Sequence, residues 1–333
     1  MKLSVLDQSP VISGHAPSHA IKETLKLARR VEQLGYLRYW LAEHHAIAAL
    51  ADPCPEILLA RLGAETKTIR IGTGGVLLPY YSAFKVAEVF RMLEAMYPGR
   101  VDLGIGRAPG GDARTARAVG GGNFPDADRF PRQVWELVGH LDGTLPEDHP
   151  ERGLRLQPEG QTAPEVWLLG SSDYSGLLSA QLGLRFAFAH FINAHGGEAV
   201  MRAYKERFQV SPREKEPHTL LCCFVICADT NEEAERRAKV VDLRRLNMAY
   251  NLDTPVPTLE QALARDFSDK EREYVRSQRA RAVIGSPVRC KERLLELAGQ
   301  FSADELMVLT ITGDYETRLE SYERLASAFA LGG

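Results

Sequence analysis

The feature that most constrains this chain is a regular alternation of short apolar runs with longer amphipathic stretches. Helical patterns follow the apolar runs, as in the stretch that Ser18 is expected to cap and that ends at Gly35. Eight strands that each lead into a helix favour an α/β fold, the (β/α)8 or TIM barrel. The predicted strands are residues 3–6, 39–42, 69–73, 101–105, 166–169, 186–189, 220–227 and 306–311.

An open, doubly wound sheet is the alternative architecture. It would carry a glycine-rich turn after the first strand, where this chain has Asp7-Gln8-Ser9-Pro10. The 333 residues exceed a minimal barrel of about 250, and the excess falls in segments 106–130, 143–164 and 249–286. We therefore expect a single domain over residues 1–333 with long insertions. The charged run 269–281 fits a solvated helix face or a cover, so segment 249–286 is the candidate lid.

The amino-acid composition restricts the classes of binding partner and the cellular compartment that we expect for this protein. With 41 Lys and Arg against 44 Asp and Glu, the net charge of −3 argues against nucleic acid or an anionic membrane surface as a partner. No apolar run approaches the roughly 18 residues of a membrane span, and the first residues lack the apolar core of a signal peptide. Five cysteines, an odd number without a C-x-x-C pair, fit reduced thiols. We therefore expect a cytoplasmic protein.

Barrel enzymes carry their chemistry at the C-terminal ends of the strands, and two such ends are rich in glycine. Gly170-Ser171-Ser172, with Ser175 soon after, opens a helix whose N–H groups and hydroxyls fit a phosphate, and Arg107 offers a counter-charge. A plain serine cap gives the same pattern. Gly72-Thr73-Gly74-Gly75-Val76 is nearly bare backbone against which a flat ring could lie, and it also fits a bulge in the barrel.

Histidines follow two of the predicted strands. Glu43-His44-His45 is an acid–base candidate, although a histidine there fits a packing role equally well. Neighbours on an extended segment face opposite ways, so only one of the two imidazoles is expected to point into a site, and both cannot bind one metal ion. No metal-ligand spacing is present, so we expect no metal. Gln8 and His190 follow the first and sixth strands, and we expect them to line a substrate pocket with His45.

Five stretches, taken together and in order, resemble the bacterial-luciferase-like, flavin-dependent monooxygenase family. The similarity runs from residue 1 to about residue 190 and continues more loosely to the C-terminus. The stretches are specific for the family and carry no information about the substrate. They are LSVLDQSP at 3–10, YWLAEHH at 39–45, GTGGVLLP at 72–79, YPGRVDLGIGRAPG at 97–110 and VWLLGSS at 166–172.

The resemblance implies a (β/α)8 barrel that binds FMN, usually reduced FMN supplied by a separate flavin reductase. It places Arg107 and the serines of the Gly170–Ser175 turn on the phosphate, and Gly74-Gly75-Val76 beside the isoalloxazine, in the family often through a non-prolyl cis peptide. His44 matches the catalytic histidine of luciferase-type members, with Glu43 next to it. Luciferases have an acidic residue where this chain has Ser171. The individual phosphate contacts therefore do not follow from the resemblance.

The implied activity is that of a monooxygenase for a small organic substrate. Reduced FMN would react with oxygen to a flavin C4a-peroxide inside a dry, apolar cavity, with His44 as general acid or base and segment 249–286 excluding water. Two alternatives remain open, a deazaflavin-dependent reductase on the same barrel and a flavin-binding protein without turnover. Related barrels commonly dimerise, so we expect a homodimer with a flavin reductase as a transient partner.

Overall fold

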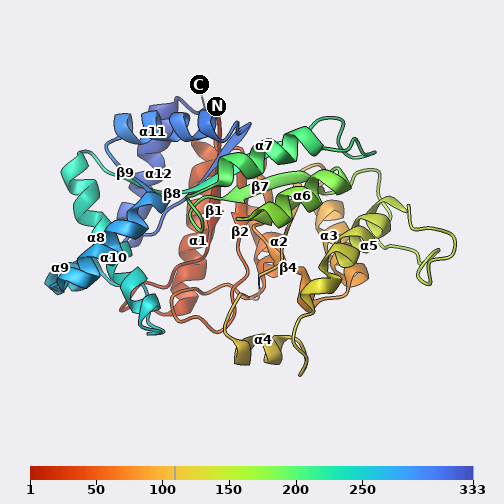
Figure 1. The fold of residues 1–333 in the computed structure, drawn as a ribbon, viewed down its shortest axis with the longest axis horizontal. Helices are drawn as coiled ribbons and strands as arrows, with labels where there is room; N and C mark the ends of the chain where they lie inside the picture. Colours follow the sequence, from red (N-terminus) through yellow and green to blue (C-terminus); the bar gives the residue numbers. More distant parts are fainter. Residues whose placement is uncertain (109, 333) are drawn as a thin grey trace.

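A closed barrel of eight parallel strands forms the centre of the protein (Figure 1). A computed structural model describes residues 1–108 and 110–332. The strands are hydrogen-bonded in the order β10–β1–β2–β3–β5–β6–β7–β8, and β8 pairs back with β10 to close the ring. This confirms the predicted (β/α)8 fold. The strands are β1 (Lys2–Asp7), β2 (Arg38–Leu41), β3 (Arg70–Thr73), β5 (Val101–Gly106), β6 (Glu165–Gly170), β7 (Arg185–Ala189), β8 (Thr219–Cys227) and β10 (Glu305–Leu309).

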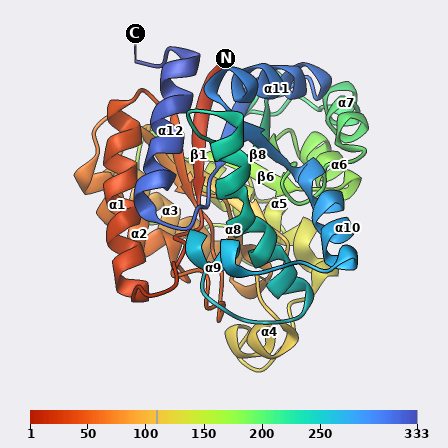
Figure 2. The ribbon, with the colours of Figure 1, turned by 90° about the vertical axis from the view of Figure 1, so that its left-hand side faces the viewer.

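Every predicted strand matches one of these strands to within two residues at each end. Helices surround the barrel on its outside (Figure 2). A helix follows each of the eight barrel strands, as the alternating pattern predicted. The surrounding helices are α1 (Pro17–Gln33), α2 (Pro55–Glu65), α3 (Ala83–Met96), α5 (Phe130–Asp142), α6 (Asp173–Leu182), α7 (Gly197–Arg207), α8 (Asn231–Ala249), α11 (Pro287–Gln300) and α12 (Tyr315–Phe329).

Two expected helix caps differ in the structure. Helix α1 begins at Pro17 after Ala16, so the prediction that Ser18 caps it was wrong. Proline suits the first helical position because its missing N–H needs no partner there. Thr230 caps α8 by accepting a hydrogen bond from the Glu233 N–H at 3.1 Å. Thr230 and Glu233 form a T-x-x-E sequence, which predicts a capping box at this helix. The Glu233 carboxylate pairs with Arg237 instead of reaching back, so only the Thr230 half of the capping box forms.

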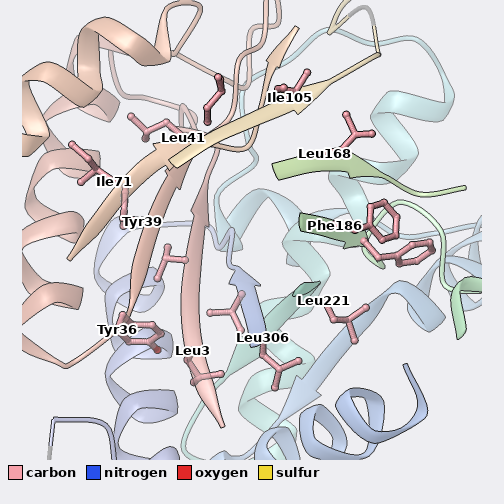
Figure 3. Packing of buried hydrophobic residues seen from close by; sticks show 14 of the residues in the cluster. Leu3, Tyr36, Tyr39, Leu41, Ile71, Ile105, Leu168, Phe186, Leu221 and Leu306 are labelled. Atoms are coloured by element: carbon pink, nitrogen blue, oxygen red, sulfur yellow. The ribbon is translucent and has the colours of Figure 1, made fainter. Parts of the chain in front are cut away.

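Side chains alternate between the two faces of the barrel wall, which gives the fold two apolar regions. Outward side chains such as Leu3, Tyr39 and Ile71 pack against the helices in the larger core (Figure 3). Inward side chains form layers along the barrel axis. Charged residues at the strand starts make the lowest layer, Trp40 and Trp167 pack edge to face above them, and the strand ends leave the uppermost layer open.

Two of the three long segments form further elements, whereas segment 143–164 contains only turns and irregular backbone. Segment 106–130 holds α4 (Ala113–Val119) and η2 (Ala127–Arg129), beyond the strand ends and away from the N-terminus (Figure 1). Segment 249–286 holds α9 (Leu259–Ala264), α10 (Asp269–Gln278), η3 (Arg279–Arg281) and β9 (Ala282–Gly285). β9 was not predicted, and it pairs with the second half of β8, beyond the point where β7 ends.

Two further short elements follow β3, namely β4 (Val76–Leu77) and η1 (Leu78–Tyr80). β4 pairs in parallel with the end of β5, so the chain after Thr73 extends the barrel wall beyond the end of β3. In the part of the chain that the structure describes, no helix combines the length and apolar character needed to cross a membrane.

Candidate functional site

A cavity of about 630 Å³ lies at the end of the barrel where the strands finish. This volume is in the range of sites that hold small molecules or cofactors. The strand ends contribute most of its wall, and α8 and segment 249–286 contribute the remainder. Residues on the wall from the strand ends include Leu6, Gln8, Trp40, Glu43, His44, Gly74, Gly75, Arg107, Leu169, Gly170, Ser171, Ser172, Phe224 and Leu309.

Bare backbone forms one part of this wall, at Gly74 and Gly75. The peptide bond between these two glycines is cis, as the family resemblance implied. A Cβ on Gly74 would lie 2.6 Å from a Leu6 methyl, and one on Gly75 would lie 2.7 Å from the Gly104 carbonyl oxygen. Neither position therefore has room for a side chain. Val76 is buried in β4 and is not on the cavity wall of the described structure, whereas Leu77 is.

The turn from β6 into α6 forms a second part of the wall. Ser172 precedes the helix, but in the described chain its hydroxyl makes no capping hydrogen bond, so the plain-cap interpretation does not hold. Ser171, Ser172 and the buried Ser175 all line the cavity. A Cβ on Gly170 would lie 2.5 Å from the Ser175 hydroxyl, so glycine allows this close turn. The start of a helix suits an anion because its first N–H groups lack intrahelical partners, and at α6 the Tyr174 N–H donates to Asp173 Oδ1 at 2.9 Å.

Arg107 lies next to this turn, just after β5 ends. Its guanidinium carbon is 4.2 Å from the centroid of the Tyr174 ring, a cation–π contact that holds the charge beside the start of α6. Among the described residues, none forms a hydrogen bond or ion pair with this exposed guanidinium. A stacked guanidinium keeps its N–H donors available, so Arg107 and the α6 turn together could hold an anion. Tyr174 was not singled out from the sequence.

His44 points into the cavity at the end of β2. Its Nδ1 is buried without a hydrogen-bond partner. Burial, with a smaller contribution from the positive charge of Arg244, lowers the pKa of His44 to about 4. The imidazole is therefore neutral near pH 7. A neutral imidazole accepts a proton at one nitrogen while it donates a hydrogen bond from the other.

Glu43 lines the same wall but is fully engaged with the protein. Its carboxylate accepts hydrogen bonds from the Leu77 N–H at 2.9 Å, the Tyr81 hydroxyl at 2.6 Å and His45 Nε2 at 2.7 Å. Three partners fix this buried carboxylate in place. It ties the end of β2 to the chain that follows the two glycines. We therefore interpret Glu43 as a positioning residue and not as a proton donor.

Of the other expected pocket residues, only Gln8 lies on the wall. His45 turns to Glu43 and is absent from the described cavity lining, as alternation along an extended segment predicts for one of two neighbours. His190 is also absent from that lining. It follows Phe186 and Phe188 on the outer face of β7 and packs edge-on against Phe301, with ring centroids 5.6 Å apart. Burial lowers the pKa of His190 to about 4.

Several wall residues come from helices, where analysis of strand ends could not find them. Arg244 and Arg245 lie on α8, and Tyr274 and Arg281 lie in segment 249–286. Arg244 is four residues after the buried Val240, so helical spacing places it on the apolar face of α8. That spacing was the available signal. No group of three His, Cys, Asp or Glu side chains that could hold a metal ion occurs in residues 1–108 and 110–332.

Comparison with known proteins gives full-length relatives. The family model described as luciferase-like monooxygenase matches residues 1–303. The uncharacterized protein YceB of Bacillus subtilis (strain 168) is 46% identical over 327 residues, which cover 98% of this chain and 99% of YceB. The N-acetyl-S-alkylcysteine monooxygenase of the same organism is 33% identical over 329 residues, which cover 98% of each chain.

Solved structures of similar fold also cover nearly the whole chain. Apo-MsnO8 has a TM-score of 0.92 and 38% identity, covering 99% of this chain and 98% of that one. An oxygenating constituent of 3,6-diketocamphane monooxygenase from Pseudomonas putida, in complex with FMN, has a TM-score of 0.72 at 18% identity, covering 98% and 97%. An F420-dependent secondary alcohol dehydrogenase has a TM-score of 0.70 at 13% identity, covering 98% of each chain. The last two show the fold alone. With its family match and full-length relatives, this chain belongs to the luciferase-like monooxygenase family.

Proposed function

We propose that this chain is an FMN-dependent monooxygenase that oxidises a small organic substrate with molecular oxygen. The observation that carries the proposal is the joint placement of three features on one cavity wall. These are the bare Gly74–Gly75 backbone, the anion site of Arg107 and α6, and the neutral His44. FMN combines a flat ring with a phosphate, and both features of the molecule have a matching surface here.

The fit assigns a role to each part of the wall. Arg107, the hydroxyls of Ser171, Ser172 and Ser175 and the first N–H groups of α6 would hold the phosphate. The backbone of Gly74 and Gly75, which a Cβ would block, would lie beside the ring, with Val76 behind it in β4. Bound in its reduced form, FMN would supply the electrons that activate oxygen.

The remaining residues would control water and protons. The wall is mainly apolar, with Leu6, Leu169 and Phe224 among its residues, and such a surface disfavours entry of water. His44 would accept or donate a proton at the substrate, and Glu43 would hold the neighbouring backbone. Segment 249–286 contributes Tyr274 and Arg281 to the wall, so it would act as the cover of the site.

The relatives support this assignment at the level of reaction class. The family name and the name of the Bacillus relative both specify a monooxygenase, and one structure of the same fold holds FMN. Supply of reduced FMN by a separate reductase and assembly as a homodimer belong to the proposal as well. Another structure of the same fold uses F420, a deazaflavin, which keeps hydride transfer without oxygen as the second candidate.

Anaerobic titration separates the two candidates. Reduced FMN and reduced F420 are titrated separately into the protein, and air is then admitted while oxygen consumption is followed. We expect reduced FMN to bind and to be reoxidised by oxygen on the protein. Binding of F420 alone would overturn the proposal, and FMN binding without any substrate-dependent oxygen use would favour a flavin-binding protein without turnover.

A further inference from the structure

The described cavity wall carries three arginines that the proposed flavin site does not use, Arg244, Arg245 and Arg281. We propose that Arg244 binds the carboxylate of the substrate, which is then a small organic acid with an apolar body. This inference rests on the proposed function, because it names the substrate class of the same cavity. It starts from the surroundings of one guanidinium.

Arg244 has no partner in the described chain. Its Nε is fully buried without a hydrogen bond, and no ion pair or hydrogen bond joins its guanidinium to any residue in 1–108 or 110–332. Burial, with a smaller contribution from the like charge of Arg245, lowers the pKa of Arg244 to about 10, so the group stays positive at neutral pH. A buried charge without a partner destabilises a folded protein. Such a group is expected where a ligand supplies the opposite charge.

The carboxylates of the cavity wall are already engaged. Glu43 accepts three hydrogen bonds, as described above, and Asp253 accepts one from the Ala48 N–H at 2.8 Å. The neighbouring Arg245 differs from Arg244, because it donates to the Gln278 carbonyl oxygen at 2.8 Å and lies over the Phe224 ring. Arg281 also lines the cavity and makes no hydrogen bond or ion pair with a described residue, but Arg244 differs from it because the Arg244 Nε is buried without a partner.

The position of Arg244 separates it from the proposed phosphate site. Arg107 and the α6 turn follow β5 and β6, whereas Arg244 is on α8, after β8, and β7 lies between β6 and β8 in the barrel. Arg244 instead lies near His44, whose pKa is lowered by burial and by the charge of Arg244. A ligand bound to Arg244 would therefore lie beside the proposed acid–base residue and not beside the flavin phosphate.

The rest of the wall defines the body of the ligand. Phe224, Val241 and Leu309 line the cavity together with the apolar residues of the strand ends. One guanidinium can pair with one carboxylate through two parallel hydrogen bonds. The site therefore suits a single negative group carried on an apolar body, and it disfavours a neutral molecule that would leave Arg244 unpaired.

Calorimetric titration of the FMN-loaded protein tests this. The probes are butanoate, hexanoate and phenylacetate, each compared with its own primary amide. We expect the wild-type protein to bind at least one acid at least tenfold more tightly than its amide. Arg244→Gln should abolish that preference and Arg244→Lys should retain part of it. Arg236→Gln, which removes an exposed charge from the same helix, should leave it unchanged.

Three results would overturn the proposal. They are equal binding of every acid and its amide, a preference that survives in Arg244→Gln, and loss of FMN affinity in that variant, which would assign Arg244 to the flavin. The ligand-free Arg244→Gln protein should have a melting temperature no lower than that of the wild type, because an unpaired charge is removed. A drop of several degrees would indicate a structural role instead. If the wild-type protein binds no FMN, the proposed function fails, and the acid and amide titrations on the free protein still test Arg244.

Discussion

The two ends of the barrel differ in whether their charged side chains have partners within the protein. At the end where the strands start, the Arg38 guanidinium contacts Asp102 at 2.9 Å, Glu165 at 2.8 Å and Glu305 at 2.9 Å. Burial opposes its charge, but these three carboxylates hold the pKa of Arg38 above its usual range. At the end where the strands finish, the Arg244 guanidinium and His44 Nδ1 have no partner among the described residues.

This difference distinguishes a structural charge from a charge that is available to a ligand. Arg38 is buried, and Arg244 is partly buried with a buried Nε, so both arginines are at least partly removed from solvent. Arg38 has several carboxylates fixed by strand register, and Trp40 also donates to Asp102 at 2.9 Å. No described carboxylate approaches Arg244. The presence or absence of ion-pair partners, rather than the burial of the arginine, therefore indicates which end of the barrel is available to a ligand.

The largest expected effect is at the paired end. Arg38→Met removes the arginine partner of the fully buried Glu305, while Asp102 and Glu165 keep Arg70. Because one buried carboxylate is left without its cation, we expect a loss of about 3–5 kcal/mol in the free energy of unfolding. Urea denaturation measures it, with an unchanged slope showing that the unfolding transition is otherwise the same. Arg61→Met, which breaks a pair with Glu65 at an arginine side chain 68% exposed, is the control and should cost less than about 0.5 kcal/mol. If Arg38→Met and Arg61→Met lowered the free energy of unfolding equally, the structural role assigned to Arg38 would be wrong.

The second largest effect is expected at the end where the strands finish, and it concerns the affinity for FMN instead of the stability of the fold. Arg107→Ala should weaken FMN binding by about 1.5–3 kcal/mol, the range for a hydrogen bond to a charged group. Riboflavin lacks the phosphate, so its affinity should be unchanged. Both dissociation constants can be measured by flavin fluorescence. Arg114→Ala, in the nearby α4, should leave them unchanged, and an unaltered FMN affinity in the Arg107 variant would remove it from the site.

Much of this arrangement was predictable from the sequence, because it depends on local patterns. Period-two runs gave all eight barrel strands, and the residues after them include His44, Gly74, Gly75 and Arg107, which do meet on one wall. Polar residues at strand ends converge in any parallel barrel, so their meeting needs no knowledge of packing. The family resemblance added the cis bond, which no propensity encodes.

The remainder depended on contacts that a linear pattern does not contain. His190 was expected in the pocket because it follows a strand, but the direction of its side chain depends on the register of β7, and it lies outside. Arg244 was missed because it comes from a helix, where its partner-free state is visible only in three dimensions. β9 consists of four residues after an arginine-rich stretch, and only its pairing with β8 identifies it.

A third, smaller effect is the pH dependence of stability that arises from two histidines, one on each side of the barrel wall. Burial lowers the pKa of both His44 and His190 to about 4, below the about 6.5 of an unfolded chain. The unfolded state therefore binds more protons between these values, so stability is present above pH 6.5 and is lost as the pH falls towards 4. Each histidine should cost about 1–2 kcal/mol between pH 7 and pH 5.

Variants separate the two histidines. Unfolding free energies of His44→Gln and His190→Gln, measured at both pH values, should each show a smaller acid loss than the wild type. Only His44→Gln should also impair substrate oxidation, while its FMN affinity is retained. Full activity in that variant would refute the proposed role of His44, and an unchanged acid sensitivity in either variant would refute the assignment of its pKa.

The smallest effect compares two serines that precede helices. The Ser82 hydroxyl accepts a hydrogen bond from the Lys85 N–H at 3.3 Å and caps α3, whereas the Ser172 hydroxyl makes no such bond at α6 in the described chain. Ser82→Ala should therefore lower the free energy of unfolding by about 0.5–1 kcal/mol. Ser172→Ala should change it by only a few tenths and should instead weaken FMN, but not riboflavin, by about 0.5–1.5 kcal/mol. If both variants lose the same stability and FMN affinity does not change, the start of α6 is an ordinary cap, and the contrast between paired and available groups would not extend to the helix ends.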